Sequence, residues 1–144
     1  MAEALERPMN RYLLDTNVVS ELRRNKPHGA VVSWLSRLQQ DQIYLSAVTL
    51  GELQSGIELT RRQNETKAKE IEQWINQVES TFHVLPMDSA CFREWGRIMP
   101  GKSNDLIEDA MIAATARVHG LIVATRNEMD FKQLDVRLLN PFKN

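Results

Sequence analysis

The chain has 144 residues, enough for one domain with a sizeable core and too few for two full domains. Its 42% hydrophobic and 26% charged residues exclude extended disorder and low-complexity polymers. The formal net charge of −1 excludes nucleic-acid binding through bulk charge, so any such binding depends on a local patch. The single cysteine, Cys91, excludes an intramolecular disulfide framework and a multi-cysteine metal site, and we expect it to be a small buried residue.

The sequence carries no feature of a membrane or secreted protein. No apolar stretch approaches the roughly 20 residues needed to cross a bilayer, and residues 1–10 lack the apolar core of a signal peptide. We therefore expect a cytoplasmic protein without membrane association. Residues 1–10 are polar and have the character of an N-terminal extension, so we expect the folded domain to occupy residues 11–144.

Short apolar runs alternate with helical patterns from residue 12 onward. Five runs are predicted strands: 12–14, 43–45, 82–85, 121–124 and 136–139. Six segments carry helical spacing or helix-start signals: 18–24, 30–40, 47–62, 66–80, 89–99 and 105–119. Because the strands are short, apolar and separated by helices, the sequence predicts one α/β domain with a central parallel sheet of four to five strands.

Two carboxylates follow predicted strands. Asp15 comes directly after residues 12–14, and Glu52 lies about two helical turns after residues 43–45. Asp15 has two interpretations, a helix N-cap or a functional carboxylate, and Thr16 or Asn17 would serve equally well as the cap. Glu52 is likewise either a solvated helix residue or part of a site. Both positions lie near the carboxyl ends of strands, where parallel sheets bind their ligands.

Asp109 lies on the apolar side of its predicted helix. Its neighbours at i+3, i+4 and i+7 are all apolar: Ile112, Ala113 and Ala116. A buried carboxylate without a partner is costly, so such a group normally has a partner or a metal ion. Asp105, one turn earlier, has a structural interpretation as an N-cap, with Glu108 completing a capping box.

Several oxygen donors are therefore expected at one edge of the sheet. Such a site suits Mg²⁺ or Mn²⁺ and not Zn²⁺, and the three histidines show no ligand spacing. The loop after the fourth strand adds Asn127 and Asp130 as further candidate ligands. In the same loop, Arg126 is a candidate partner for the carboxylates or for a substrate phosphate.

Five segments of the chain read LLDTNVVSE at 13–21, LSAVTLGEL at 45–53, DAMIAATA at 109–116, VATRN at 123–127 and NPF at 140–142. In this order and spacing they resemble the PIN-domain proteins of the VapC/FitB branch of toxin–antitoxin ribonucleases. The resemblance covers nearly all of residues 11–142. It implies a three-layer α/β/α PIN-like domain with an acidic pocket.

The resemblance also implies roles for individual residues. Asp15, Glu52 and Asp109 match three acidic positions of the family and are the expected catalytic residues and ligands of Mg²⁺ or Mn²⁺. The fourth acidic position commonly holds Asp and here holds Asn127, which can offer a carbonyl oxygen but no charge. One metal ion or two remains open, and Asp130 either compensates or caps a short helix. The residues expected to support the site or contact substrate are Thr16, Asn17, Ser46, Thr125 and Arg126.

Membership of this family implies an RNA-cleaving toxin with several partners. These are a second copy of the chain, a cognate VapB/FitA-like antitoxin and, through the antitoxin, promoter DNA; apolar surface on residues 47–62 and 66–80 is a candidate site for the protein contacts. Two basic clusters are either RNA contacts or solvated helix faces. The first comprises Arg23, Arg24 and Lys26, and the second comprises Arg61, Arg62, Lys67 and Lys69.

Three alternatives remain at the level of sequence. A dehalogenase-like phosphatase needs a second Asp two positions after Asp15, where this chain has Asn17. A phospho-receiver domain needs an acceptor Asp at the end of the third strand and a Lys after the fifth, where the chain offers only Asp88 and the terminal Lys143. A PIN fold that binds RNA or antitoxin without cutting is the third, because Asn127 is neutral.

Overall fold

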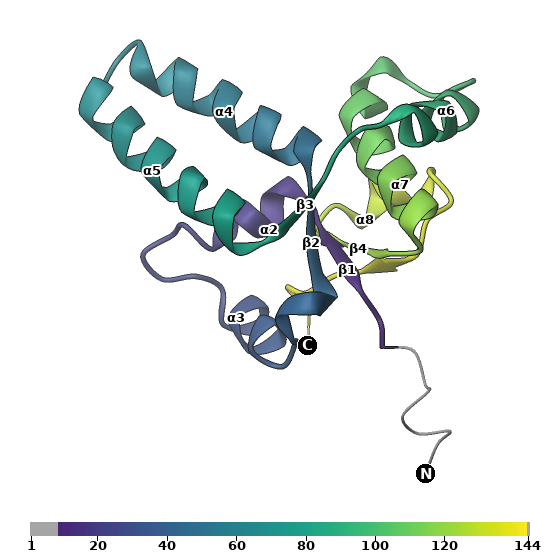
Figure 1. The fold of residues 1–144 in the computed structure, drawn as a ribbon, viewed down its shortest axis with the longest axis horizontal. Helices are drawn as coiled ribbons and strands as arrows, with labels where there is room; N and C mark the ends of the chain where they lie inside the picture. The colour runs from purple at the N-terminus through teal and green to yellow at the C-terminus, as the bar shows by residue number, and fades with distance from the viewer. Residues whose placement is uncertain (1–8, 144) are drawn as a thin grey trace.

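The computed structural model describes residues 9–143, which form a five-stranded sheet covered by helices (Figure 1). The strands are β1 (Tyr12–Leu14), β2 (Ile43–Ser46), β3 (His83–Leu85), β4 (Ile122–Ala124) and β5 (Leu138–Leu139). Their order is β3-β2-β1-β4-β5, and each neighbouring pair is parallel. The predicted parallel sheet is confirmed. The predicted N-terminal extension lies outside the described residues, apart from Met9 and Asn10.

Seven α-helices connect and cover the strands of this described region. They are α2 (Thr16–Glu21), α3 (Gly29–Ser36), α4 (Ala47–Arg61), α5 (Glu65–Thr81), α6 (Ser89–Ile98), α7 (Ile107–His119) and α8 (Glu128–Lys132). The helix predicted at 18–24 begins earlier, because Asp15 and not a later residue is its cap. The helix predicted at 30–40 ends at Ser36, and a separate 3₁₀ turn follows at Gln40–Gln42. None of these helices is long and apolar enough to cross a membrane.

The predicted cap at Asp105 is wrong. A 3₁₀ turn at Asn104–Leu106 precedes α7, and the Ser103 hydroxyl caps that turn by accepting a hydrogen bond from the Asp105 backbone N–H at 3.1 Å. Helix α7 itself has no side-chain cap, so Glu108 completes no capping box. Glu108 is instead an exposed residue that lies beside α4.

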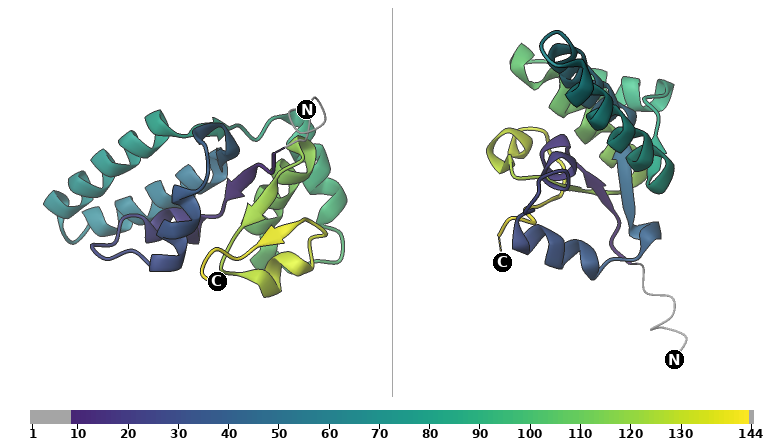
Figure 2. Two further views of the ribbon diagram at one scale, coloured as in Figure 1. Left: turned by 90° about the horizontal axis from the view of Figure 1, so that it is seen from below. Right: turned by 90° about the vertical axis from the view of Figure 1, so that its left-hand side faces the viewer.

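The two faces of the sheet carry separate layers of helices. Successive residues of a strand point to opposite faces, and β1 shows this division clearly. Leu13 packs in the cluster formed with α6, α7 and α8, whereas Leu14 packs in the cluster formed with α2 and α3. The three-layer α/β/α arrangement expected from the sequence is therefore confirmed (Figure 2). Cys91 on α6 is fully buried, as predicted.

Helices α4 and α5 form an antiparallel hairpin that extends beyond the sheet (Figures 1 and 2). A small core of its own holds the pair together and consists of Ile57, Ala68 and Ile75. Near its tip the Arg61 guanidinium forms ion pairs with three carboxylates, those of Glu58 at 2.9 Å, Glu65 at 3.2 Å and Glu72 at 2.9 Å. Arg61 therefore joins the two helices of the hairpin.

The strand order reverses direction beside β1. The chain places β2 and β3 on one side of β1 and then places β4 on its other side. A parallel sheet has its ligand site at such a switch point, because the connections leave opposite faces there and a crevice opens between them. Asp15 follows β1 at this point, and its backbone N–H donates to the carbonyl of Ala124 in β4 at 2.9 Å.

Candidate functional site

Asp15 is a buried carboxylate held by three hydrogen bonds, and it is only 4% exposed. The Thr16 backbone N–H donates to Oδ1 at 2.8 Å, while Asn17 Nδ2 and Thr125 Oγ1 donate to Oδ2 at 3.1 and 2.8 Å. Burial raises the pKa of Asp15, and these hydrogen bonds offset only part of that effect. The N-cap interpretation of Asp15 is confirmed, and the same carboxylate lies at the switch point, where a functional role stays a prediction.

Thr125 supports Asp15 from a position with no access to solvent. Its hydroxyl donates to Asp15 and accepts from the backbone N–H of Asn127 at 2.8 Å and from Asn17 Nδ2 at 3.3 Å. One donor and two acceptor positions are thereby used in full. Ser46 is also fully buried, and its hydroxyl caps α4 by accepting from the Val48 backbone N–H at 3.0 Å. Both side chains were expected either to support the site or to contact substrate. Because both are fully buried, neither can contact substrate directly in this structure.

Glu52 is tied to α2 through Thr16. The Thr16 hydroxyl donates to Glu52 Oε1 at 2.6 Å and lies 3.1 Å from the hydroxyl oxygen of Thr49. Although the residue as a whole is exposed, its carboxyl group is partly desolvated, and this desolvation, together with the charges of Asp15 and Glu108, raises the pKa of Glu52. Sequence reasoning missed Thr49, whose only signal is its position one helical turn before Glu52.

Asp109, on α7, is the third carboxylate of this region, and its neighbours are also negatively charged. The side chain is half-buried, and the three apolar neighbours predicted to share its face are fully buried. Burial raises the pKa of Asp109 to about 7, and further contributions come from four carboxylates: Asp15, Asp130, Glu52 and Glu108. In the structure, the three predicted carboxylates therefore lie close enough for their charges to interact. Glu108, which the sequence analysis gave a structural role, also contributes its charge.

Asn127 and Asp130 interact with each other. Asn127 Nδ2 donates to Asp130 Oδ2 at 2.8 Å, and the charge of Asp130 is one of the causes that raise the pKa of Asp109. Asn127 is the N-cap residue of α8, but no side-chain hydrogen bond caps this helix. The capping role considered for Asp130 is therefore wrong. The negative charge of Asp130 lies close to Asp109, although Asn127, at the fourth acidic position of the family, is neutral.

The acidic cluster, here defined as Asp15, Glu52 and Asp109, has no basic partner among residues 9–143. None of the ion pairs formed within residues 9–143 involves these three carboxylates. Within the same residues, no three Asp, Glu, His or Cys side chains lie close enough together to hold a metal ion unaided. The chemistry of the donors, oxygen atoms with excess negative charge, suits a hard divalent cation such as Mg²⁺, which retains part of its water shell.

Two cavities meet at Glu52. One, of about 540 Å³, lies between α4 and α7 and is lined in part by Glu52, Glu108 and Met111. The other, of about 460 Å³, is lined in part by Thr16, Arg23, Glu52 and Trp74 from α2, the turn after it, α4 and α5. Glu52 therefore borders open space in both cavities.

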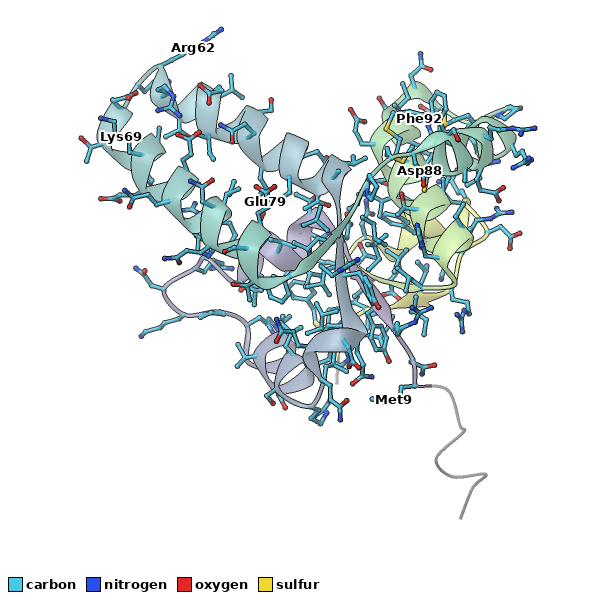
Figure 3. All side chains as sticks on the ribbon, in the orientation of Figure 1. Met9, Arg62, Lys69, Glu79, Asp88 and Phe92 are labelled. Atoms are coloured by element: carbon cyan, nitrogen blue, oxygen red, sulfur yellow. The ribbon has the colours of Figure 1, made fainter. Side chains whose placement is uncertain are left out.

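The predicted basic clusters have different surroundings. Arg23 lines the smaller cavity beside Glu52, whereas Arg24 pairs with the buried Glu21 at 3.5 Å. Arg61 is already occupied by its three carboxylates, and Arg62 and Lys69 lie near the outer end of the hairpin (Figure 3). About 15 Å of helix separates that end of α4 from Glu52. The structure therefore favours Arg23 over the hairpin cluster as a phosphate contact.

The sequence allowed an ion pair between Arg126 and the acidic cluster, but Arg126 forms none among residues 9–143. Its guanidinium carbon lies 3.8 Å from the centroid of the Phe142 ring, in a cation–π arrangement. Its backbone N–H donates to Asn17 Oδ1 at 3.2 Å. Asn17 therefore connects Arg126 to Asp15, since its Nδ2 donates to that carboxylate.

The phosphatase and receiver alternatives lack the carboxylates they require. Asn17 occupies the position of the phosphatase acid and donates its amide hydrogen to Asp15. Strand β3 ends at Leu85, and Asp88 caps α6 by accepting from the Cys91 backbone N–H at 3.0 Å. The phosphatase alternative therefore lacks its acid, and the receiver alternative lacks an acceptor carboxylate at the end of β3.

Comparisons with known proteins point to one family. The family model described as PIN domain matches residues 12–137. The chain is 36% identical to "Toxin FitB" of Neisseria gonorrhoeae, covering 90% of this chain and 97% of that protein. It is 33% identical to "VapC ribonuclease Y4jK" of Sinorhizobium fredii, covering 91% of this chain and 97% of that protein.

Solved structures agree with these relatives. The crystal structure of FitAcB from Neisseria gonorrhoeae matches with a TM-score of 0.81 and 36% identity, covering 92% of this chain and 99% of the other. The structure of FitAB bound to an IR36 DNA fragment matches with a TM-score of 0.80 and 35% identity, covering 92% and 96%. The fold is thus shared over nearly the whole of both chains.

The hydrogen bonds of Thr125 predict a large effect of a small substitution. Thr125→Val removes the buried donor to Asp15 and the acceptor for two N–H groups, so we expect the free energy of unfolding to fall by about 1–3 kcal/mol. The pKa of Asp15, measured by NMR titration, should rise further. Thr115→Val is the matched control, because its buried hydroxyl donates to Met111 O within its own helix. Equal losses in the two variants, or an unchanged Asp15, would contradict this account.

The raised pKa of Asp109 predicts a pH-dependent gain from neutralising it. Because the native pKa of about 7 exceeds the ordinary 3.8, the metal-free protein loses stability as pH rises from about 4 to about 7. Asp109→Asn should therefore be more stable than the wild type by about 1–2 kcal/mol at pH 8, a value discounted for partial exposure. Urea unfolding in EDTA measures this difference.

The same experiment at lower pH supplies its own check. The advantage of Asp109→Asn should shrink steadily below pH 7 and be smallest near pH 4, where native Asp109 is protonated. Asp105→Asn, which removes an exposed carboxylate one turn earlier, should not reproduce the gain. If the free energies of unfolding of Asp109→Asn and the wild type differ by a constant amount from pH 4 to 8, ionised Asp109 does not destabilise the fold as proposed.

Proposed function

Because the chain belongs to the PIN-domain family of VapC and FitB toxin–antitoxin ribonucleases, we propose that it is a metal-dependent endoribonuclease that hydrolyses RNA phosphodiester bonds. The proposed catalytic residues are Asp15, Glu52 and Asp109. The observation that carries the proposal is the clustering of these carboxylates without a basic partner among residues 9–143. Burial, followed by the charges of the nearby carboxylates, raises the pKa of Asp109 to about 7. Enzymes commonly place such perturbed carboxylates at their active sites.

The proposed cofactor is Mg²⁺ or Mn²⁺. Asp15, Glu52 and Asp109 would hold the ion directly or through water, while Asn127 and Asp130 lie close enough to one another to act as an additional oxygen pair. When bound, such an ion activates water and stabilises the negative charge that develops on the phosphate. The neutral Asn127 favours fewer direct ligands than a family member with Asp at this position would have.

The surrounding side chains fix the positions of the carboxylates. Thr16 contacts both acidic residues at once, since its backbone N–H bonds to Asp15 and its hydroxyl bonds to Glu52. Asn17 and Thr125 hold the second oxygen of Asp15. This arrangement keeps Asp15 and Glu52 in place before substrate arrives and so reduces the reorganisation needed during reaction.

The proposed substrate is RNA, and its phosphates would approach along the cavities beside Glu52. Arg23 lies in the smaller cavity and is a candidate phosphate contact there. Cleavage of cellular RNA in the cytoplasm would make the protein a toxin. The name "VapC ribonuclease" of one relative supports this activity.

The proposed partners are a second copy of the chain and a VapB/FitA-like antitoxin that binds promoter DNA. The related FitAB structure bound to a DNA fragment supports the DNA contact, at 35% identity. The hairpin of α4 and α5 offers apolar surface for protein contacts, since Leu59 is 62% exposed. In this proposal the antitoxin suppresses RNA cleavage until it is removed.

Asp15→Asn tests the proposed reaction. Asparagine keeps an acceptor oxygen for the α2 cap but removes the negative charge, so the fold should persist while cleavage falls at least 100-fold. The measurement induces each variant in cells and maps new RNA ends, and then repeats cleavage with purified protein in Mg²⁺ or Mn²⁺. Asp41→Asn, at an exposed carboxylate in the 3₁₀ turn before β2, is the matched control.

The outcomes separate the enzyme from the non-cutting alternative. Growth arrest and discrete RNA ends from the wild type and Asp41→Asn, both absent from Asp15→Asn, are the expected result. Equal cleavage by Asp15→Asn would place the chemistry elsewhere. Binding of RNA by all three proteins without any cleavage in either metal would instead support a PIN-fold regulator, as the neutral Asn127 allows.

A further inference from the structure

The C-terminal turn is fastened to the loop that follows β4. Asn140 Nδ2 donates to Glu128 Oε2 at 2.9 Å, and Lys143 Nζ pairs with the same carboxylate at 2.6 Å. The Asn140 side chain also accepts from the Phe142 backbone N–H at 2.9 Å, which closes the turn. Glu128 begins α8, only one residue after Asn127. The last residues of the described chain are therefore held against the acidic side of the molecule.

This turn places the Phe142 ring between two polar side chains. The ring is half-buried and packs against the core formed with α2 and α3. His28 meets it edge-on with ring centroids 5.4 Å apart, and the Arg126 guanidinium carbon lies over it at 3.8 Å from the centroid. Because the ring is held by packing, its cation–π contact restrains the guanidinium above it.

Arg126 directly follows Thr125, whose hydroxyl bonds to Asp15, and the Arg126 guanidinium remains unpaired within residues 9–143. No ion pair of those residues includes it, and its side chain is exposed. Its backbone is one hydrogen-bonded residue away from Asp15, through Asn17. An unrestrained arginine beside carboxylates would be drawn toward them. The contact with the Phe142 ring instead restrains the Arg126 guanidinium.

Resting on the proposed ribonuclease function, we propose that Phe142 is a positioning residue that holds Arg126 as a contact for an RNA phosphate beside the acidic cluster. The planar guanidinium carries N–H donors in a fixed fork that suits phosphate, and a stacked guanidinium keeps that fork free at its edge. The phosphate contact would offset the repulsion between RNA and the carboxylates. The C-terminal turn is thus part of the substrate site and not only a structural end.

Two measurements test the role of Phe142. The first is binding of a fluorescein-labelled single-stranded RNA in EDTA, where cleavage is absent, followed by fluorescence anisotropy. The second is cleavage in Mg²⁺ or Mn²⁺, with kcat and KM determined separately. The variants are Phe142→Leu, Phe142→Tyr, Arg126→Gln and the double variant Phe142→Leu/Arg126→Gln. Phe92→Leu and Arg93→Gln, at exposed residues of α6, are matched controls.

We expect Phe142→Leu and Arg126→Gln each to weaken RNA binding and raise KM by roughly tenfold, with kcat within about twofold of the wild type. The double variant should be no weaker than Arg126→Gln alone, because both changes remove one interaction. Phe142→Tyr, which keeps the ring, should behave as the wild type. The α6 controls should leave binding unchanged.

Several results would overturn the proposal. Additive losses in the double variant would show that Phe142 acts independently of Arg126, and wild-type binding by Arg126→Gln would remove the phosphate contact. If Phe142→Leu fails to fold, Arg126→Gln and Phe142→Tyr still decide the question. A wild type that binds RNA but never cleaves it refutes the nuclease alone, and one that neither binds nor cleaves refutes both.

Discussion

Uncompensated negative charge at the switch point of the sheet is the constraint on which the rest of the structure depends. Asp15, Glu52 and Asp109 come from three separate elements, and no ion pair among residues 9–143 neutralises them. The pKa of Asp109 rises to about 7 through burial and the nearby charges. This repulsion opposes folding in the absence of a cation, so the fold must hold the carboxylates together by other means.

Neutral donors supply that restraint. Thr16, Asn17 and Thr125 direct N–H and O–H groups at the carboxylates, and each adds a bond that favours the ionised form without cancelling its charge. A lysine or arginine in their place would neutralise the site and compete with a metal ion. In our proposal Phe142 has a related role, since its contact with Arg126 restrains this guanidinium and does not leave it free to pair with the carboxylates.

Much of this architecture could be predicted from the sequence. The alternation of apolar runs and helices gave the parallel sheet, and the apolar stripe around Asp109 indicated its burial. The position of Glu108 could not be predicted, because it depends on how α7 packs against α4. The stacking of Arg126 on Phe142 also required the tertiary structure, since it joins residues from two loops. The cap at Asp105 was mispredicted because a 3₁₀ turn, with the same local signals, precedes α7.

A paramagnetic NMR titration with Mn²⁺ tests the central claim most directly. If the charge at the switch point is a cation site, substoichiometric Mn²⁺ should first broaden the amide resonances around Asp15, Glu52 and Asp109. The carboxylates of the hairpin provide an internal control, because they are already paired with Arg61. Broadening centred on the hairpin, or uniform broadening without preference for the acidic cluster, would contradict the account.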